Sequence, residues 1–169
     1  MLSNFTWQVK CEFISSSIIW ILEHSKNPLN FKSLKTCTHQ ANGNNPLCGD
    51  KVEIFTNIKN DINDEICFQG AGCAISIASA SILTKVLNKK SVQDSKNILE
   101  NFIKMVENKE FNFDLLNNEE KTLLMTFSEL QKFPMRSKCA TMSWSTFNAA
   151  LNRDNYNTEA KVWMSKIQN

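Results

Sequence analysis

The stretch "EICFQGAGCAISIASASIL", residues 65–83, changes its hydrophobic period partway along. Before Gly70, apolar and polar residues alternate as in a half-buried strand, with Ile66 and Phe68 on one face. After Cys73, apolar residues recur at helical spacing, and the small residues between them allow close packing. The stretch therefore predicts a strand that passes through a glycine turn into a helix beginning at about Cys73.

The residues before this stretch predict the rest of a sheet. Val52, Ile54 and Ile58 alternate with polar residues, which is typical of a half-buried strand. The turn-forming residues "NDINDE", residues 60–65, then predict a hairpin that joins this strand to the one described above. A weaker strand is predicted at residues 34–38, so we expect an antiparallel sheet of about three strands.

Helices account for most of the remaining chain. Residues 18–24 have helical periodicity, with serines 15–17 as cap candidates. Further amphipathic helices are predicted at residues 91–107 and 117–133, and another after Pro134. Strands followed by helices indicate an α+β fold, a small antiparallel sheet packed by several helices. We expect a single domain over residues 1–169, with its core at about 18–151.

The composition excludes several classes of protein. A chain of 169 residues with 42% hydrophobic residues is long enough for one buried core. A net charge of +2 without a basic stripe argues against a nucleic-acid partner. The apolar run from Ile18 to Leu22 is too short for a membrane span. Six cysteines without an export signal favour a reducing compartment, so we expect a cytoplasmic protein.

Three cysteines lie at predicted junctions of the fold. Cys48 precedes a strand, Cys73 begins a helix, and Cys139 in "RSKCA" stands near the start of a late helix. Because helix N-termini favour anions, Cys73 and Cys139 are predisposed to be thiolates if they lie in the first turns of their helices. With the Asp50 carboxylate, the three sulfurs make a plausible tetrahedral set for zinc. Neighbouring glycines let the backbone approach such a site: Gly49, Gly70 and Gly72.

Spacing alone leaves the ordinary alternatives open. No CxxC pair occurs, and free cysteines often pack as small hydrophobes in a core. Asp50 follows a glycine, where aspartate commonly caps a turn or a strand entry.

Three segments together resemble a known family. They are "NNPLCGD" at 44–50, "FQGAGCAISIASAS" at 68–81 and "FPMRSKCATMSW" at 133–144. In this order they are similar to the three cysteine motifs of the iron-sulfur cluster assembly proteins of the IscU/NifU N-terminal superfamily. The long segment between the second and third cysteines resembles the SufU branch. The histidine that the IscU branch carries before its third cysteine is replaced by Lys138, and the Leu-Pro-Pro-Val-Lys chaperone motif of that branch is absent.

The resemblance implies a zinc-dependent sulfurtransferase that carries sulfur for iron-sulfur cluster assembly. Zn²⁺ would be held by Cys48, Asp50, Cys73 and Cys139. Cys48 would accept persulfide sulfur from a cysteine desulfurase, the SufS-like pyridoxal-phosphate enzyme. The sulfur would then pass to downstream iron-sulfur scaffold proteins.

Zinc suits a protected persulfide acceptor in physical terms. The metal deprotonates a cysteine and masks its nucleophilicity, and a carboxylate ligand is less firmly committed to zinc than a fourth thiolate. Three thiolates and one carboxylate on Zn²⁺ carry a formal charge of about −2. Arg136 and Lys138 are candidates to offset this charge by hydrogen bonding to a sulfur or to the carboxylate. An exposed position at the helix start is the alternative for both.

Two other functions stay open. The same three cysteines could hold a transient [2Fe-2S] cluster on a scaffold, or the protein could be a degenerate paralogue with zinc and no sulfur transfer. The second alternative arises from "EHSKNPLN", residues 23–30, which is similar to the partner-docking segment of the family. Ser25 and Leu29 stand where that segment has tyrosine and arginine.

Several conspicuous residues receive no functional role. The spacing of Trp144 and Phe147 is typical of a helix core. The same structural interpretation applies to the remaining cysteines, and a loop position to one histidine: Cys11, Cys37, Cys67 and His39.

Overall fold

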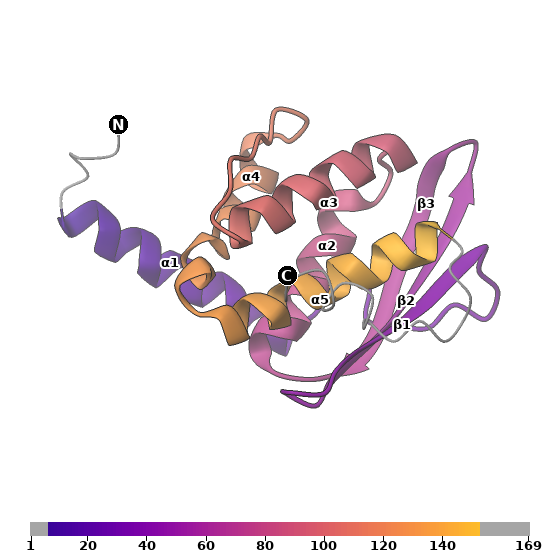
Figure 1. Ribbon diagram of the computed structural model, residues 1–169. Helices are drawn as coiled ribbons and strands as arrows, with labels where there is room; N and C mark the ends of the chain where they lie inside the picture. The colour runs from indigo at the N-terminus through magenta and orange to yellow at the C-terminus, as the bar shows by residue number, and fades with distance from the viewer. Residues whose placement is uncertain (1–6, 153–169) are drawn as a thin grey trace, which may run out of the picture.

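The computed structural model of the chain describes residues 7–152, with side chains from residue 16 on. Figure 1 shows helices gathered on one side of a small sheet. The elements are α1 (Trp7–Lys26), β1 (His39–Asn45), β2 (Asp50–Lys59), β3 (Ile62–Ala71), α2 (Ala74–Leu87), α3 (Val92–Val106), α4 (Asn118–Met125), the 3₁₀ helix η1 (Ser128–Lys132) and α5 (Pro134–Leu151). The predicted α+β class is confirmed.

The sheet is antiparallel with the strand order β1-β2-β3, as predicted. Asn60 and Asp61 join β2 to β3 and both have positive φ angles, 50° and 63°. A two-residue turn of this handedness matches the twist of the flanking strands. The register places Ile54 opposite Phe68, and both are fully buried on the helix-covered face.

The strand predicted at residues 34–38 is wrong. The third strand is instead β1, "HQANGNN", and so His39 is its first residue and not a loop residue. Close packing explains the glycine within this polar strand, because a Cβ at Gly43 would lie 2.0 Å from the Thr146 Oγ1 atom of α5. Pairing with β2 and close packing under α5 therefore select β1, and neither is visible in hydrophobic periodicity.

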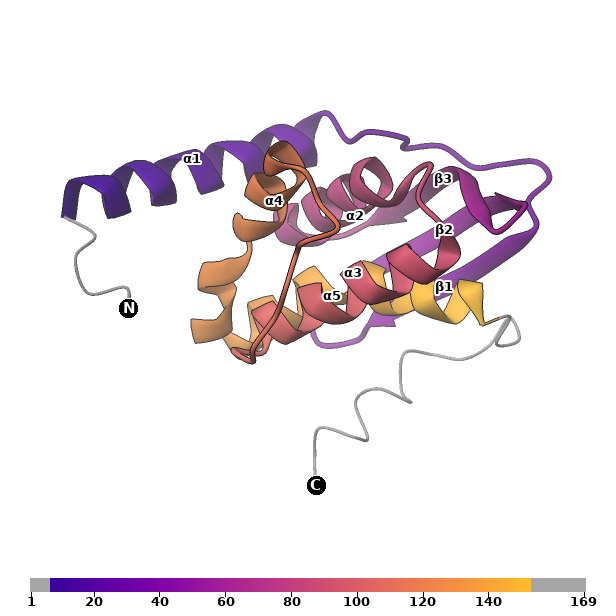
Figure 2. The same ribbon diagram turned by 90° about the horizontal axis from the view of Figure 1, so that it is seen from above.

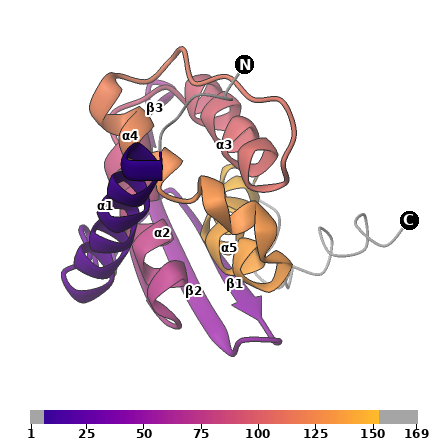
Figure 3. The same ribbon diagram turned by 90° about the vertical axis from the view of Figure 1, so that its left-hand side faces the viewer.

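The helices form two layers above the sheet. In Figure 3, α2 and α5 lie side by side over the strands, and α1 and α3 lie outside them. In Figure 2, α1 extends well beyond the rest of the molecule. The helix predicted at residues 18–24 thus begins earlier, at Trp7, and the serine cap candidates lie inside it, since no glycine or proline interrupts residues 7–26. None of the described helices is both long and apolar enough to cross a membrane.

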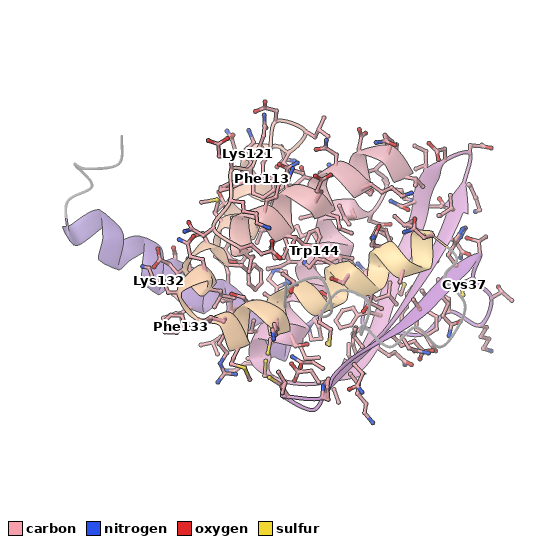
Figure 4. The ribbon with its side chains drawn as sticks, viewed as in Figure 1. Cys37, Phe113, Lys121, Lys132, Phe133 and Trp144 are labelled. Atoms are coloured by element: carbon pink, nitrogen blue, oxygen red, sulfur yellow. The ribbon has the colours of Figure 1, made fainter. Side chains whose placement is uncertain are left out.

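The core is centred on α5. Trp144 is fully buried and stacks on Phe102 with 4.2 Å between ring centroids, while its indole N–H donates to Ser79 Oγ at 3.0 Å. Figure 4 labels Trp144 inside the molecule, between α5 and the helices above it. Phe147 is also fully buried, so the predicted core role of both aromatic residues is confirmed. The helix predicted at 117–133 is divided into α4 and η1.

Candidate metal centre

The predicted ligand residues come from three parts of the fold. Cys48 lies in the loop between β1 and β2, and Asp50 is the first residue of β2. Cys73 is the N-cap of α2, and Cys139 lies in the second turn of α5. Asp50 and Cys139 are buried, Cys73 is half-buried, and Cys48 is exposed.

A tight hairpin places Cys48 at the surface. Asn45 pairs with Asp50 at the end of β1 and β2, and its carbonyl accepts hydrogen bonds from the backbone N–H groups of Cys48 at 3.2 Å and Gly49 at 2.9 Å. Gly49 has φ of 71°, a conformation that glycine adopts without steric cost. The turn therefore projects the Cys48 thiol outward beside the Asp50 carboxylate.

The ligand atoms lie close together. The Sγ atoms of Cys48 and Cys139 are 3.3 Å apart, and these two sulfurs and a carboxylate oxygen of Asp50 all lie within 4.8 Å of one another. Cys73 joins the group through Asp50, with 3.7 Å between its Sγ and Oδ2 of the aspartate. Tetrahedral zinc with sulfur at about 2.3 Å would separate two ligand sulfurs by about 3.8 Å. The donor types fit zinc, the Cys48–Cys139 separation is about 0.5 Å shorter than this value, and Cys73 lies outside the group of three, in contact with Asp50.

N–H groups surround every predicted ligand except one. The backbone N–H of Cys73 donates to Asp50 Oδ1 at 2.9 Å, and the N–H of Ser76 donates to Cys73 Sγ at 3.5 Å. The side-chain amide of Asn45 points at Cys139 Sγ from 4.0 Å. Among the described residues, no N–H group donates to Cys48 Sγ. The exposed thiol is thus the least anchored of the four.

Cys139 differs from the sequence-based expectation. It lies one turn inside α5 and is fully buried, so it does not face the first-turn N–H groups that favour a thiolate. Burial is the main cause that raises the pKa of the Cys139 thiol, and its neighbour Cys48 raises it further. The thiol donates to the Met135 carbonyl at 3.5 Å. A bound cation is the kind of group that would hold this residue as a thiolate.

The two basic candidates differ in their exposure. Arg136 is exposed and Lys138 is half-buried. Neither side chain makes a hydrogen bond or an ion pair with another described residue, although the Arg136 backbone N–H donates to the Phe133 carbonyl at 2.9 Å. The role predicted for them toward a metal stays a prediction. Among the described residues, the N–H groups that face the predicted ligands belong to Cys73, Ser76 and Asn45.

Two glycines allow close backbone approach near the site. A Cβ on Gly72 would lie 2.7 Å from Asp50 Oδ1, and one on Gly70 would lie 2.3 Å from the Lys51 carbonyl. Either contact is too short for a real Cβ. A side chain at position 72 would therefore displace the carboxylate itself.

The other cysteines lie outside this group. Cys67 is fully buried on β3, and burial raises the pKa of its thiol to about 11. Cys37 is half-buried just before β1, at the opposite end of that strand from Cys48, and Figure 4 labels it at the right of the sheet. Cys11 lies outside the residues whose side chains are described. No disulfide joins any of the described cysteines.

The segment that resembles a docking motif is fastened to α2. Ser81 Oγ is 2.8 Å from His24 Nδ1 and accepts a hydrogen bond from the Leu29 backbone N–H, also at 2.8 Å. Ser25 Oγ donates back to the Leu22 carbonyl at 2.8 Å, while the Leu29 side chain is 41% exposed. This segment therefore has a structural role in joining α1 to the core.

Curated proteins resemble this chain over most of its length. The zinc-dependent sulfurtransferase SufU of Bacillus subtilis is 31% identical over 134 residues, which are 79% of this chain and 88% of that protein. The iron-sulfur cluster assembly scaffold protein IscU of Streptococcus pyogenes is 31% identical over 135 residues, 79% of this chain and 80% of that protein.

Solved structures share the fold. A putative iron-sulfur cluster assembly scaffold protein for the SUF system from Fervidobacterium islandicum superposes with a TM-score of 0.72 at 28% identity, covering 78% of this chain and 93% of that one. The N-terminal part of a NifU-like protein from Brucella abortus has a TM-score of 0.70 at 15% identity, over 82% of this chain and 95% of that one, and supports the fold alone. The family description "NifU-like N terminal domain" matches residues 19–140. The chain therefore belongs to the NifU-like N-terminal domain family, as its three cysteine motifs predicted.

Proposed function

We propose that the protein is a zinc-dependent sulfur carrier for iron-sulfur cluster assembly, with Cys48 as the sulfur acceptor and with Asp50, Cys73 and Cys139 completing the metal site. One observation carries the proposal. Three thiols and a carboxylate converge at one end of the sheet, and only the Cys48 thiol is both exposed and without an N–H donor among the described residues.

The proposed transfer needs no oxidant or reductant. The Cys48 thiolate attacks the outer sulfur of a persulfide on the donor protein, a new S–S bond forms on Cys48, and the donor's S–S bond breaks. The donor's cysteine leaves as a thiolate, which takes up the proton that the Cys48 thiol has lost. Bound zinc supplies the deprotonation of the thiols and masks their nucleophilicity until the donor arrives.

The other predicted ligands have different tasks. The Cys73 N–H holds the Asp50 carboxylate in place, and Asp50 in turn lies against the Cys73 thiol. Cys139 is buried under the loop of Cys48 and cannot reach a partner's sulfur. These three side chains can therefore keep the site assembled while Cys48 moves outward.

The proposed donor is a cysteine desulfurase of the SufS type, a pyridoxal-phosphate enzyme. Large apolar side chains close to the thiols in sequence are exposed, with Leu47 57%, Phe133 58% and Met135 49% accessible. Exposed apolar groups beside a reactive thiol indicate a surface that another protein covers. The similarity to a protein described as the zinc-dependent sulfurtransferase SufU supports a role in sulfur transfer. The described cysteines are all free, which fits the reducing cytoplasm that we propose as the compartment.

A [2Fe-2S] scaffold is the second candidate. It is favoured by the names of two relatives, the Streptococcus pyogenes and Fervidobacterium islandicum proteins, which are both described as scaffolds. Thiolates suit an iron-sulfur cluster as well as zinc. Such a scaffold would deliver assembled clusters instead of sulfur.

The decisive test compares Cys48→Ser with Cys37→Ser, a matched change at a cysteine on the opposite end of β1. Metal content is measured by elemental analysis, and alanine formation by a SufS-type desulfurase is measured with and without each protein. We expect about one zinc per wild-type chain, activation by wild type and Cys37→Ser, and no activation by Cys48→Ser. Intact mass should show one added sulfur atom on wild type and on Cys37→Ser, and none on Cys48→Ser.

Other results would select the alternatives. A visible chromophore with acid-labile sulfide after reconstitution with iron and sulfide, and no activation, would identify a scaffold. Zinc without activation of any desulfurase tested would identify a structural site.

A further inference from the structure

The geometry points to Asn45 as a positioning residue of the metal centre. Its side-chain amide contacts the Cys139 sulfur through the nitrogen and the Cys48 loop through the oxygen, and so fixes one relative to the other. This inference rests on the proposed zinc site. It concerns a residue that is not itself a ligand.

Asn45 is buried and bonded on both sides of the turn that follows it. Its side chain is 3% exposed, and its Oδ1 accepts the backbone N–H of Leu47 at 3.2 Å. Its backbone carbonyl accepts the N–H groups of Cys48 and Gly49. One residue therefore closes the loop that presents the acceptor cysteine.

The amide nitrogen of Asn45 points at the candidate metal centre. Cys139 Sγ, 4.0 Å away, is the one acceptor that Nδ2 has among the described residues. A buried amide N–H costs free energy unless an acceptor is present, and a neutral thiol sulfur is a weak acceptor. A metal-bound thiolate carries negative charge and accepts more strongly, so we expect this contact to shorten in the zinc-loaded protein.

The zinc-loaded site would be negatively charged. Three thiolates and a carboxylate on Zn²⁺ leave about −2 of formal charge. Within the described chain, no cationic side chain makes a hydrogen bond or an ion pair to the four ligands, whereas N–H groups meet Asp50, Cys73 and Cys139. Asn45 supplies the single side-chain donor of this set. Residues that orient ligands in this way typically change metal affinity by about 10 to 100-fold when they are replaced.

The test uses Asn45→Asp, which keeps the size of the side chain and an oxygen to accept the Leu47 N–H but replaces the N–H donor. The matched control is Asn44→Asp, the same change one residue earlier, where the side chain is exposed on the other face of β1. Zinc affinity is measured by competition with a chromophoric chelator, and Co²⁺-loaded proteins give the thiolate-to-cobalt charge-transfer band. Asn45→Asp should bind zinc at least about tenfold more weakly with a shifted band, and Asn44→Asp should match wild type.

A measurement on the wild-type protein keeps the inference testable if Asn45→Asp does not fold. In ¹¹³Cd-loaded protein, an N–H···S hydrogen bond transmits scalar coupling from cadmium to the side-chain amide protons of Asn45. Coupling supports the inference. Absence of coupling, or equal zinc affinities and equal cobalt spectra for folded Asn45→Asp and Asn44→Asp, overturns it.

These results are separable from the proposed function. If wild type binds no zinc or cadmium, the metal site itself is wrong. If wild type binds zinc and Asn45→Asp binds it equally well, only the role of Asn45 is wrong.

Discussion

At the residue scale, the Asp50 carboxylate occupies space that exists only because position 72 has no side chain. The Gly72 backbone lies against the carboxylate from one side, and the Cys73 N–H bonds it at 2.9 Å from the same strand exit. The carboxylate is 1% exposed, so it cannot relax into solvent without opening the hairpin. Glycine here is a steric requirement of the candidate metal site.

Gly72→Ala should therefore weaken zinc binding with little effect on the core. The new Cβ would meet Asp50 Oδ1 at 2.7 Å and push the carboxylate away from the thiols. We expect zinc affinity to fall by about tenfold or more, measured by chelator competition. Ala71→Ser adds one heavy atom at the neighbouring exposed position and should leave the affinity unchanged. Equal affinities for the two variants would contradict the steric argument.

The sequence predicts which residues gather at this site better than it predicts what surrounds them. The motifs identify Cys48, Asp50, Cys73 and Cys139, and the structure brings Cys48, Asp50 and Cys139 together, with Cys73 against Asp50. The role of the Asn45 amide was missed, because its position depends on the packing of α5 against β1. In the sequence alone, a polar residue before a proline indicates a turn and nothing more.

At the element scale, the joint between α1 and α2 depends on a buried histidine. His24 is 5% exposed and its Nδ1 lies 2.8 Å from Ser81 Oγ, which also accepts the Leu29 N–H. Burial is the main cause that lowers the pKa of His24, and Lys85 lowers it further. The folded protein therefore favours the neutral ring.

This arrangement predicts a pH-dependent stability. Because the folded-state pKa of His24 lies below the unfolded value, the unfolded chain binds the proton more readily, and stability is lost as the pH falls through about 6.5 toward the folded pKa. Wild type should lose more stability than His24→Gln between pH 7.5 and pH 5.5 in chemical denaturation. At pH 7.5, His24→Gln should cost about 1 kcal/mol through the lost hydrogen bond.

Ser25→Ala, a change at the neighbouring residue that does not titrate, is the control. It should keep the wild-type dependence on pH. If His24→Gln and wild type lose equal stability on acidification, His24 is not the group responsible.

The elements themselves were predictable where hydrophobic period and turn chemistry agree. The hairpin of β2 and β3, the start of α2 after the glycine turn, and α3 behind its Ser91 cap all follow from local sequence. β1 does not, because it is polar and contains the glycine that α5 requires. The 3₁₀ helix η1 also escaped prediction, since its residues continue a helical pattern while the backbone tightens before Pro134.

At the scale of the whole molecule, the candidate metal centre joins the hairpin to both helices that cover the sheet. Its predicted ligands lie on the β1–β2 loop, β2, the start of α2 and α5. A cation bound there would cross-link elements that otherwise meet through packing and a few hydrogen bonds, such as that from the Trp144 indole N–H to Ser79. Binding that is specific for the folded state stabilises it by about 4 kcal/mol at a ligand concentration 1,000 times Kd.

Chelation of the metal should therefore lower the melting temperature substantially. A loss of about 4 kcal/mol corresponds to about 10 °C for a chain of this length. Scanning calorimetry of zinc-loaded protein before and after chelation, with reductant present, measures the difference. Returning zinc should restore the transition, while an unchanged melting temperature would mean that the site does not hold metal in the folded protein.

The α+β class was predictable because the strands precede most of the helices, and the family was predictable because its three cysteine motifs occur in order. The relative arrangement of the helices was not, since it depends on which faces of α2 and α5 meet around Trp144.

The contact between Cys48 and Cys139 spans 91 positions of the chain, and this separation has a consequence during synthesis. A ribosome adding about 5 to 20 residues per second needs about 5 to 18 seconds to pass from one cysteine to the other. Throughout that interval the nascent hairpin presents the Cys48 thiol without its counterpart on α5. The Cys48 thiol of the nascent chain is therefore accessible to oxidants and metal ions during this interval, and the translation rate sets how long it stays so.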